Sequence, residues 1–300
     1  MSLQELEVVR SILRETDLAL AGPVDAARAN FEAMLAAAPL DEAIAFEETT
    51  VGGVPALRAT PPGASEERVM LYLHGGAFVI GSAHGYRAFW SGLARDTGVT
   101  GVAVDYRLAP EHPFPAAVDD ALAAYRALLD EGRRPGQIVV AGDSAGGGLA
   151  ASLLVAARDA GLPMPAGALL LSPWADLRCD APSYESKAGE DLSLTPEDLR
   201  ASADRYLNGA DPAEPLASPV EADLSGLPPL LITVGSCEIL LDDAVRLAAR
   251  AGHCGVRVTL DVWPQMPHVW QSFAFMLSEG AEASLDATQW LARRLEEEDR

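Results

Sequence analysis

Ser144 stands in a sequence pattern that is typical of a catalytic nucleophile. The segment Gly142-Asp143-Ser144-Ala145-Gly146-Gly147-Gly148 follows a short apolar run, Gln137–Ala141, and opens a helical stretch, Ala145–Ala160. A Gly-x-Ser-x-Gly segment between a strand and a helix folds into a sharp, strained turn that lifts the serine hydroxyl clear of the backbone. The same turn directs the free N–H groups of the helix N-terminus at whatever binds there. The pattern predicts nucleophilic chemistry at Ser144.

His268 is the candidate for the base that this serine requires. A serine hydroxyl is a weak nucleophile without a base, and the base needs an acid to orient it. Of the five histidines, only His253 and His268 follow Ser144. Behind a turn of this kind the chain order is serine, acid, histidine, with the histidine after the last strand. His268 holds that place, whereas His253 lies between a helix and a strand, at the opposite edge of the sheet.

Glu238 is the candidate for the orienting acid. It lies in the turn that follows the apolar run Pro229–Val234, which is the penultimate predicted strand. Asp242 and Asp243 come one turn later, and we expect them on the next helix, where they stabilise its N-terminus. Asp242 stays the alternative acid.

A glycine-rich loop after the run Arg68–Leu73 offers donors for a developing oxyanion. In His74-Gly75-Gly76-Ala77 the small residues let backbone N–H groups turn inward, and the N–H of Ala145 joins them. Each such donor stabilises an acyl-transfer transition state by about 3 kcal/mol. We therefore assign Gly75, Gly76, Ala77 and Ala145 to the oxyanion hole, although the sequence leaves open which of the first three point inward. We expect His74 to hold the loop by hydrogen bonding.

The elements that position these residues alternate between short apolar runs and helical stretches. Short buried strands that alternate with helices predict a parallel sheet covered on both faces, an α/β fold. In such sheets the site forms at the carboxyl ends of the strands. The predicted strands are Val54–Ala59, Arg68–Leu73, Thr100–Tyr106, Gln137–Ala141, Ala166–Leu171, Pro229–Val234 and Val256–Val262. The predicted helices are Tyr86–Thr97, Phe114–Glu131, Ala145–Ala160, Ile239–Ala251 and one near Ala281–Glu297.

Two further regions do not fit this alternation. Residues 1–37 have helical periodicity with a break at Gly22-Pro23, and residues 178–224 hold no good strand but a predicted helix at Asp191–Leu207. Together they predict a helical lid. The predicted organisation is an N-terminal helical cap segment at 1–45, core at 46–177, a cap insertion at 178–224 and core again at 225–300.

Composition excludes several classes of function. The formal net charge of −22 disfavours nucleic acid and anionic membrane surfaces as partners. Three cysteines without paired spacing predict neither a disulfide framework nor a metal site. The N-terminus lacks the basic start and apolar block of a signal peptide, and no apolar run approaches the roughly 20 residues of a membrane helix. We expect a cytoplasmic protein without membrane association.

Taken together, these motifs resemble the hormone-sensitive lipase family of esterases, its bacterial branch in particular. The resemblance runs from about Glu66 to the C-terminus. It is carried by His74-Gly75-Gly76-Ala77, Asp105-Tyr106-Arg107-Leu108-Ala109-Pro110-Glu111, Gly142-Asp143-Ser144-Ala145-Gly146-Gly147 and Met266-Pro267-His268.

The resemblance implies an α/β-hydrolase fold, a mostly parallel twisted sheet with helices on both faces and a helical cap. It implies a carboxylesterase that cleaves esters with short to medium acyl chains through an acyl-enzyme on Ser144, with a small-molecule ester as substrate and no cofactor or metal. It also implies frequent homodimers, and loop-ordering roles for Arg107 and Glu111.

Two positions depart from the family pattern. Ala77 replaces the usual third glycine of the oxyanion loop, and Glu238 stands where an Asp-x-Leu-x-Asp pattern usually has its first aspartate. The backbone N–H of Ala77 remains, and a glutamate orients an imidazole from a suitably moved backbone.

Other functions stay open at this point. The same triad serves lactone hydrolysis, amide hydrolysis and acyl transfer. Some plant relatives of the family are hormone receptors that have lost the catalytic histidine, and the presence of His268 weighs against that role. A lipase for bulky lipids is disfavoured because the chain shows no long exposed apolar lid helix.

Overall fold

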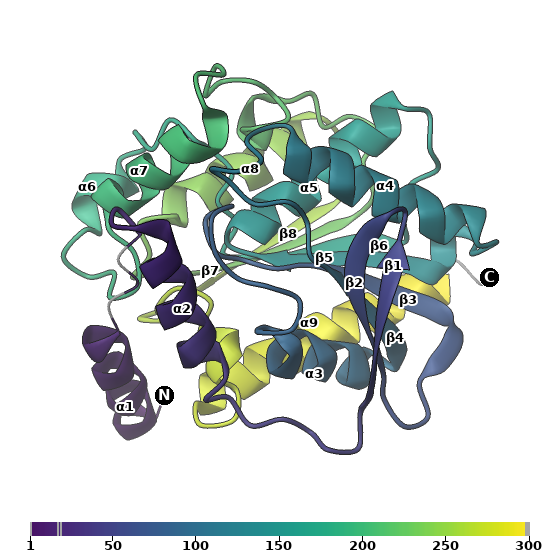
Figure 1. The fold of residues 1–300 in the computed structure, drawn as a ribbon, viewed down its shortest axis with the longest axis horizontal. Helices are drawn as coiled ribbons and strands as arrows, with labels where there is room; N and C mark the ends of the chain where they lie inside the picture. The colour runs from purple at the N-terminus through teal and green to yellow at the C-terminus, as the bar shows by residue number, and fades with distance from the viewer. Residues whose placement is uncertain (1, 17, 19, 298–300) are drawn as a thin grey trace.

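An eight-stranded sheet forms the centre of the molecule (Figure 1). The computed structural model describes residues 2–16, 18 and 20–297. The strands are β1 (Ala45–Val51), β2 (Val54–Thr60), β3 (Ser65–Leu73), β4 (Val99–Val104), β5 (Ile138–Asp143), β6 (Gly167–Leu171), β7 (Leu230–Gly235) and β8 (Val258–Trp263). Their order across the sheet is β1-β2-β4-β3-β5-β6-β7-β8. β1 pairs with β2, and β2 with β4, in antiparallel fashion, and the remaining pairs are parallel. The predicted fold class is confirmed.

Helices cover both faces of this sheet, as its apolar strands require. α3 (Arg87–Thr97) and α9 (Ser278–Glu297) lie on one face, and α4 (Ala116–Asp130), α5 (Ala145–Asp159) and α8 (Leu241–His253) lie on the other (Figure 1). Every residue of β4, β5, β6 and β7 is buried. A strand that is covered on both faces tolerates no polar alternation, which is why these strands are continuous apolar runs in the sequence.

The structure adds one strand that the sequence analysis did not predict. β1 pairs with β2 through a tight hairpin, with Val51 opposite Val54. β1 is an edge strand, and most of its residues are exposed or half-buried. Because many of its residues are polar, β1 does not form an apolar run in the sequence.

One predicted helix begins later than expected. α7 spans Pro196–Leu207, so the predicted start at Asp191 is wrong by five residues. Thr195 caps the helix by accepting a hydrogen bond from the amide of Asp198. Asp191 instead accepts hydrogen bonds from the amides of Ser193 and Leu194, which fold the chain into a turn before the helix.

Two segments that are distant in sequence lie side by side at the end of the sheet where the parallel strands finish (Figure 1). The first holds α1 (Leu3–Glu15) and α2 (Val24–Leu35), and the second holds α6 (Ser183–Ser186) and α7. The amide of Ala21 donates to Asp198 at 2.9 Å, and Arg205 donates to the carbonyl of Gly22 at 2.8 Å. Residues 1, 17 and 19 of the predicted cap lie outside the described residues. The division of the chain into cap and core stays a prediction.

Within the described ranges, no helix combines the length and the apolar character needed to span a bilayer.

Candidate active site

Ser144 lies at the sharp turn between β5 and α5. Its backbone angles, φ 54° and ψ −123°, fall in a region that residues with a side chain rarely adopt. A Cβ at Gly146 would lie 2.0 Å from the carbonyl oxygen of Leu73, and one at Gly142 would lie 2.3 Å from that of Gly146. Glycine is therefore needed on both sides of the serine for the turn to close against β3.

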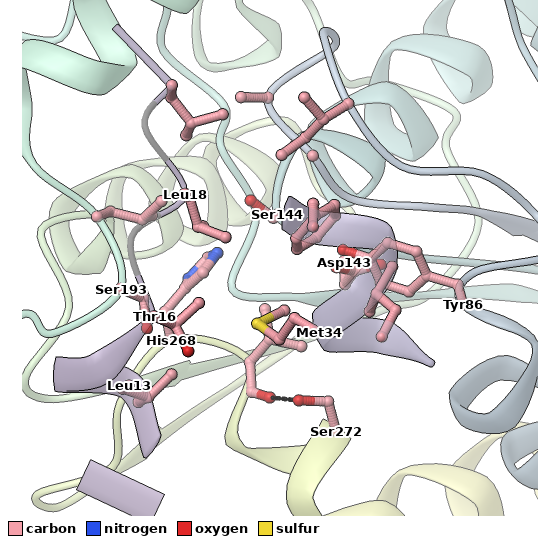
Figure 2. Close-up of a pocket in the computed structure, with 18 of the residues that line it drawn as sticks. Leu13, Thr16, Leu18, Met34, Tyr86, Asp143, Ser144, Ser193, His268 and Ser272 are labelled. Carbon is pink, nitrogen blue, oxygen red and sulfur yellow. Dashed lines mark hydrogen bonds between the residues drawn. The ribbon is translucent and has the colours of Figure 1, made fainter. Parts of the chain in front are cut away.

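His268 and Glu238 form a hydrogen-bonded pair beside this turn. The Nδ1 of His268 lies 2.7 Å from the Oε2 of Glu238. The other carboxylate oxygen, Oε1, accepts hydrogen bonds from the Ser172 hydroxyl at 2.7 Å and from the amide of Gly235. Because both oxygens are engaged, the carboxylate has a fixed orientation. In Figure 2 the imidazole ring of His268 reaches toward Ser144.

The charges around this pair set the protonation of the histidine. Burial alone lowers the pKa of His268, but the carboxylates of Glu238, Asp191 and Asp143 outweigh it and raise that pKa above its usual value. Burial raises the pKa of Glu238, and the neighbouring His268 opposes this rise. The arrangement stabilises an imidazolium, the cation that a general base forms when it takes a proton from a nucleophile.

The glycine-rich loop after β3 is held against Ser144 by the carboxylate of Asp143. The Oδ1 of Asp143 accepts the amide of Gly75 at 2.9 Å and the hydroxyl of Tyr72 at 2.6 Å. The N–H of Gly75 is engaged in this bond, whereas no such bond holds the N–H groups of Gly76 and Ala77 in the described structure. Gly76 and Ala77 line the cavity over Ser144, and Ala145 opens α5. Burial raises the pKa of Asp143 to about 6.

A small cavity of about 90 Å³ lies over Ser144 (Figure 2). Ser144 and His268 line it together with the oxyanion loop. Much of its remaining wall comes from the two helical segments and is mostly apolar: Leu13, Thr16, Leu18, Leu20, Phe31, Met34 and Leu35 from the N-terminal one, and Leu192, Ser193 and Leu194 from the insertion. The core supplies the rest: Ile80, Tyr86, Asp143, Val269, Ser272 and Phe273. Ser144 is 7% exposed, so a substrate must enter this cavity to reach it.

The structure separates the other candidates from this centre. Asp242 accepts a hydrogen bond from the amide of Ser183 at 2.8 Å, and Asp243 is buried and accepts the amides of Ala175 and Asp176. The Nδ1 of His74 lies 2.7 Å from the carbonyl oxygen of Gly75, so this histidine bonds within the loop. None of these contacts reaches Ser144 or His268.

Arg107 and Glu111 each form an ion pair with a neighbouring helix. Glu111 pairs with Arg28 of α2 at 2.7 Å, and Arg107 pairs with Asp120 of α4 at 2.8 Å. These ion pairs fix the loop after β4 to the helices around it.

Three residues at this site, Ser172, Asp143 and Asp191, were not predicted from the sequence. Ser172 directly follows β6, and its position at the carboxyl end of a central strand was a usable signal. Asp143 lies inside the nucleophile motif, but nothing in the motif predicts its bond to Gly75. Asp191 carries no spacing signal at all, because its partners are the backbone amides of Ser193, Leu194 and Ile239.

Within the described ranges, no cluster of three or more His, Cys, Asp or Glu side chains is arranged to hold a metal ion.

Several known proteins are similar to this chain in sequence and fold. Residues 70–272 match the sequence model of a protein family whose members have the alpha/beta hydrolase fold. An acetyl-hydrolase of Streptomyces hygroscopicus is 50% identical over 74% of this chain and 74% of its own length. An esterase of Acinetobacter venetianus is 38% identical over 76% of this chain and 75% of its own length.

The similarity to one solved structure covers almost the whole chain. The crystal structure of an esterase from the bacterial hormone-sensitive lipase family is 46% identical and superimposes with a TM-score of 0.94, covering 98% of this chain and 99% of that one. Fold, motifs and identity at this level agree, and the chain belongs to the bacterial hormone-sensitive lipase family of α/β-hydrolase esterases.

Proposed function

We propose that the protein hydrolyses carboxylic esters with short to medium acyl chains through an acyl-enzyme on Ser144. The observation that carries this proposal is the junction of the strained Ser144 turn with the His268–Glu238 pair at one cavity. A serine placed in this way, with a base and a fixed acid beside it, is equipped for acyl transfer. The names of the relatives, acetyl-hydrolase and esterase, support the same substrate class.

The mechanism follows from these positions. His268 takes the proton of the Ser144 hydroxyl through Nε2 while the hydroxyl oxygen attacks the ester carbonyl. Glu238 holds Nδ1 and stabilises the imidazolium. The amides of Gly76, Ala77 and Ala145 donate to the oxyanion. The imidazolium then gives its proton to the departing alcohol, and water, activated by His268, releases the carboxylic acid and frees Ser144.

The first test measures turnover of p-nitrophenyl esters from acetate to palmitate by the wild type and by Ser144→Ala. We expect turnover that favours short chains and is lost in the variant. Labelling with a fluorophosphonate should add one phosphonyl group to Ser144, located by peptide mass spectrometry. Ser152→Ala is the matched control. Ser152 is a buried serine of α5, and its hydroxyl donates to the carbonyl of Gly148 in the same helix.

Other outcomes assign a different activity. A folded wild type that cleaves no ester but opens lactones or cleaves amides contradicts esterase activity and keeps the Ser144 mechanism. Failure to label Ser144 contradicts the mechanism itself.

Cytoplasmic location and homodimer formation are further parts of this proposal. The described chain holds three free cysteines, Cys179, Cys237 and Cys254, which supports a reducing compartment. Light scattering on the purified protein measures the oligomeric state.

A further inference from the structure

A second, larger cavity adjoins the cavity over Ser144. It measures about 620 Å³, against about 90 Å³ for the first. It lies between the end of α1, α2, α3 and the segment after His268. The two cavities share one wall, which is made of Thr16, Met34, Leu35, Tyr86, Ser272 and Phe273.

The sizes decide what the first cavity holds. Pockets that enclose a whole small organic ligand measure about 300–1,000 Å³. The cavity over Ser144 is far below that range and takes a short acyl group, whereas the second cavity lies inside it. A longer chain attached to Ser144 therefore needs space beyond the first cavity, and the shared wall is where such space adjoins it.

The lining of the second cavity suits a hydrocarbon chain. Its larger side chains include Ile12, Phe89, Phe275 and Met276. Glu15 is the one charged side chain among the described residues that line it, and it is exposed. Phe275 is 48% exposed, an unusually open position for a phenylalanine. An apolar ligand in this cavity would remove apolar surface from water.

The position of His268 indicates which arm of the ester points this way. The imidazolium must give its proton to the alcohol oxygen, so the alcohol arm lies on the His268 side of Ser144. In Figure 2, Leu18 and Ser193 lie on that side, while Met34 and Tyr86 lie on the other. Of the shared wall, Met34, Tyr86 and Ser272 lie on the side away from Leu18 and Ser193, and Thr16 lies beside His268. Most of the shared wall that Figure 2 labels therefore lies on the acyl side.

We infer that the second cavity is a subsite for the distal part of medium-length acyl chains, and that Met34 separates it from the cavity over Ser144. This inference rests on the proposed esterase function. Met34 lies between His268 and Tyr86 in Figure 2 and belongs to both cavities. Its side chain is half-buried and unbranched, with three rotatable bonds, so it changes rotamer without a change in the backbone. Short acyl groups fit behind it, and a longer chain displaces it.

The test compares kcat/KM for p-nitrophenyl octanoate with kcat/KM for p-nitrophenyl acetate in each variant. Ala88→Trp fills the second cavity from α3 and should lower the octanoate-to-acetate ratio about tenfold or more. Ala33→Trp fills it from α2 at an exposed position and should act in the same direction, which protects the test if the first variant misfolds. Met34→Ala opens the wall and should raise the ratio. The control is Ala36→Trp, an exposed position that lines neither cavity, and it should leave the ratio unchanged.

The outcomes separate this inference from the proposed function. Acetate turnover that depends on Ser144, with the same ratio in all variants, overturns the subsite and leaves the esterase intact. A repeat with octyl acetate and ethyl acetate tests the direction. If Ala88→Trp impairs octyl acetate and spares p-nitrophenyl octanoate, the cavity holds the alcohol arm and the inference is wrong. Absence of turnover on any ester contradicts the proposed function instead.

Discussion

Asp191 accepts a hydrogen bond from the backbone amide of Ile239 at 2.9 Å, although 48 residues separate the two in the chain. Ile239 directly follows Glu238, so this bond ties the insertion to the turn that carries the proposed catalytic acid. The other oxygen of Asp191 accepts the amides of Ser193 and Leu194, which line the cavity over Ser144. One buried carboxylate therefore positions part of the cavity wall and the acid turn together.

The charges around His268 predict the pH dependence of the wild type. A general base works in its neutral form, and Glu238, Asp191 and Asp143 raise the pKa of His268. A raised pKa keeps the imidazole protonated, and inactive as a base, up to a higher pH. We therefore expect the acid limb of kcat/KM for p-nitrophenyl acetate to have its midpoint above about 6.5, the usual value for histidine. A midpoint below that value would show that burial outweighs the three carboxylates.

Asp191→Asn should move this limb. The variant removes one negative charge near His268, so the pKa of the imidazole falls and the acid limb shifts to lower pH. The asparagine oxygen can still accept the amides of Ser193 and Leu194, but its NH₂ group then faces the amide of Ile239, and we also expect a lower kcat. A purely structural role would lower kcat or stability without moving the limb. Asp204→Asn, which alters an exposed carboxylate on α7, is the control.

Glu238→Gln should cost far more activity than Asp242→Asn. Glutamine keeps the shape of the acid but loses the charge that stabilises the imidazolium and selects its tautomer. We expect kcat to fall on the order of 10⁴-fold. Asp242 bonds to the amide of Ser183, and its replacement should leave most of the activity. Steady-state kinetics on both variants, with folding checked by circular dichroism, make the comparison. If the Asp242 variant is the worse of two folded proteins, Glu238 is not the acid.

The sequence predicted the residues whose place follows from chain order. Ser144 and Glu238 follow the buried strands β5 and β7, and His268 follows the edge strand β8. Parallel strands bring their carboxyl ends to one edge of a sheet. Apolar runs made seven of the eight strands visible, and β1 escaped because an edge strand with an exposed face needs no such run.

What the sequence could not predict depends on contacts across the fold. Asp191 binds backbone amides, and every residue other than proline offers one, so no pattern of residue types marks its partners. The engagement of the Gly75 amide also depends on an approach of two loops, since Gly75 and Asp143 belong to turns after different strands. Two glycines in a row indicated a loop that turns amides inward, but not which amide stays free.

Asp143→Asn should weaken the oxyanion loop. The Oδ1 of the carboxylate accepts from both Tyr72 and Gly75. Asparagine replaces this charged acceptor with a neutral one and adds a competing donor. A hydrogen bond to a charged group contributes about 1.5–3 kcal/mol, against about 0.5–1.5 kcal/mol between neutral groups, so both bonds weaken. We expect kcat to fall more than KM rises, because the loop carries the proposed donors of Gly76 and Ala77.

Stability against pH gives this variant a second readout. The folded state raises the pKa of Asp143 to about 6, above the usual value of 3.8. Folding therefore favours the protonated form of Asp143. The resulting stabilisation of the folded state is complete below pH 3.8 and is lost as the pH rises through about 6. Denaturant unfolding across this window should show the wild type losing stability relative to Asp143→Asn as the pH rises. Tyr72→Phe removes one donor and keeps the carboxylate, so it should retain the pH dependence that the asparagine variant lacks. Equal slopes in the wild type and in Asp143→Asn would mean that the carboxylate is ionised throughout, and that its hydrogen bonds outweigh its burial.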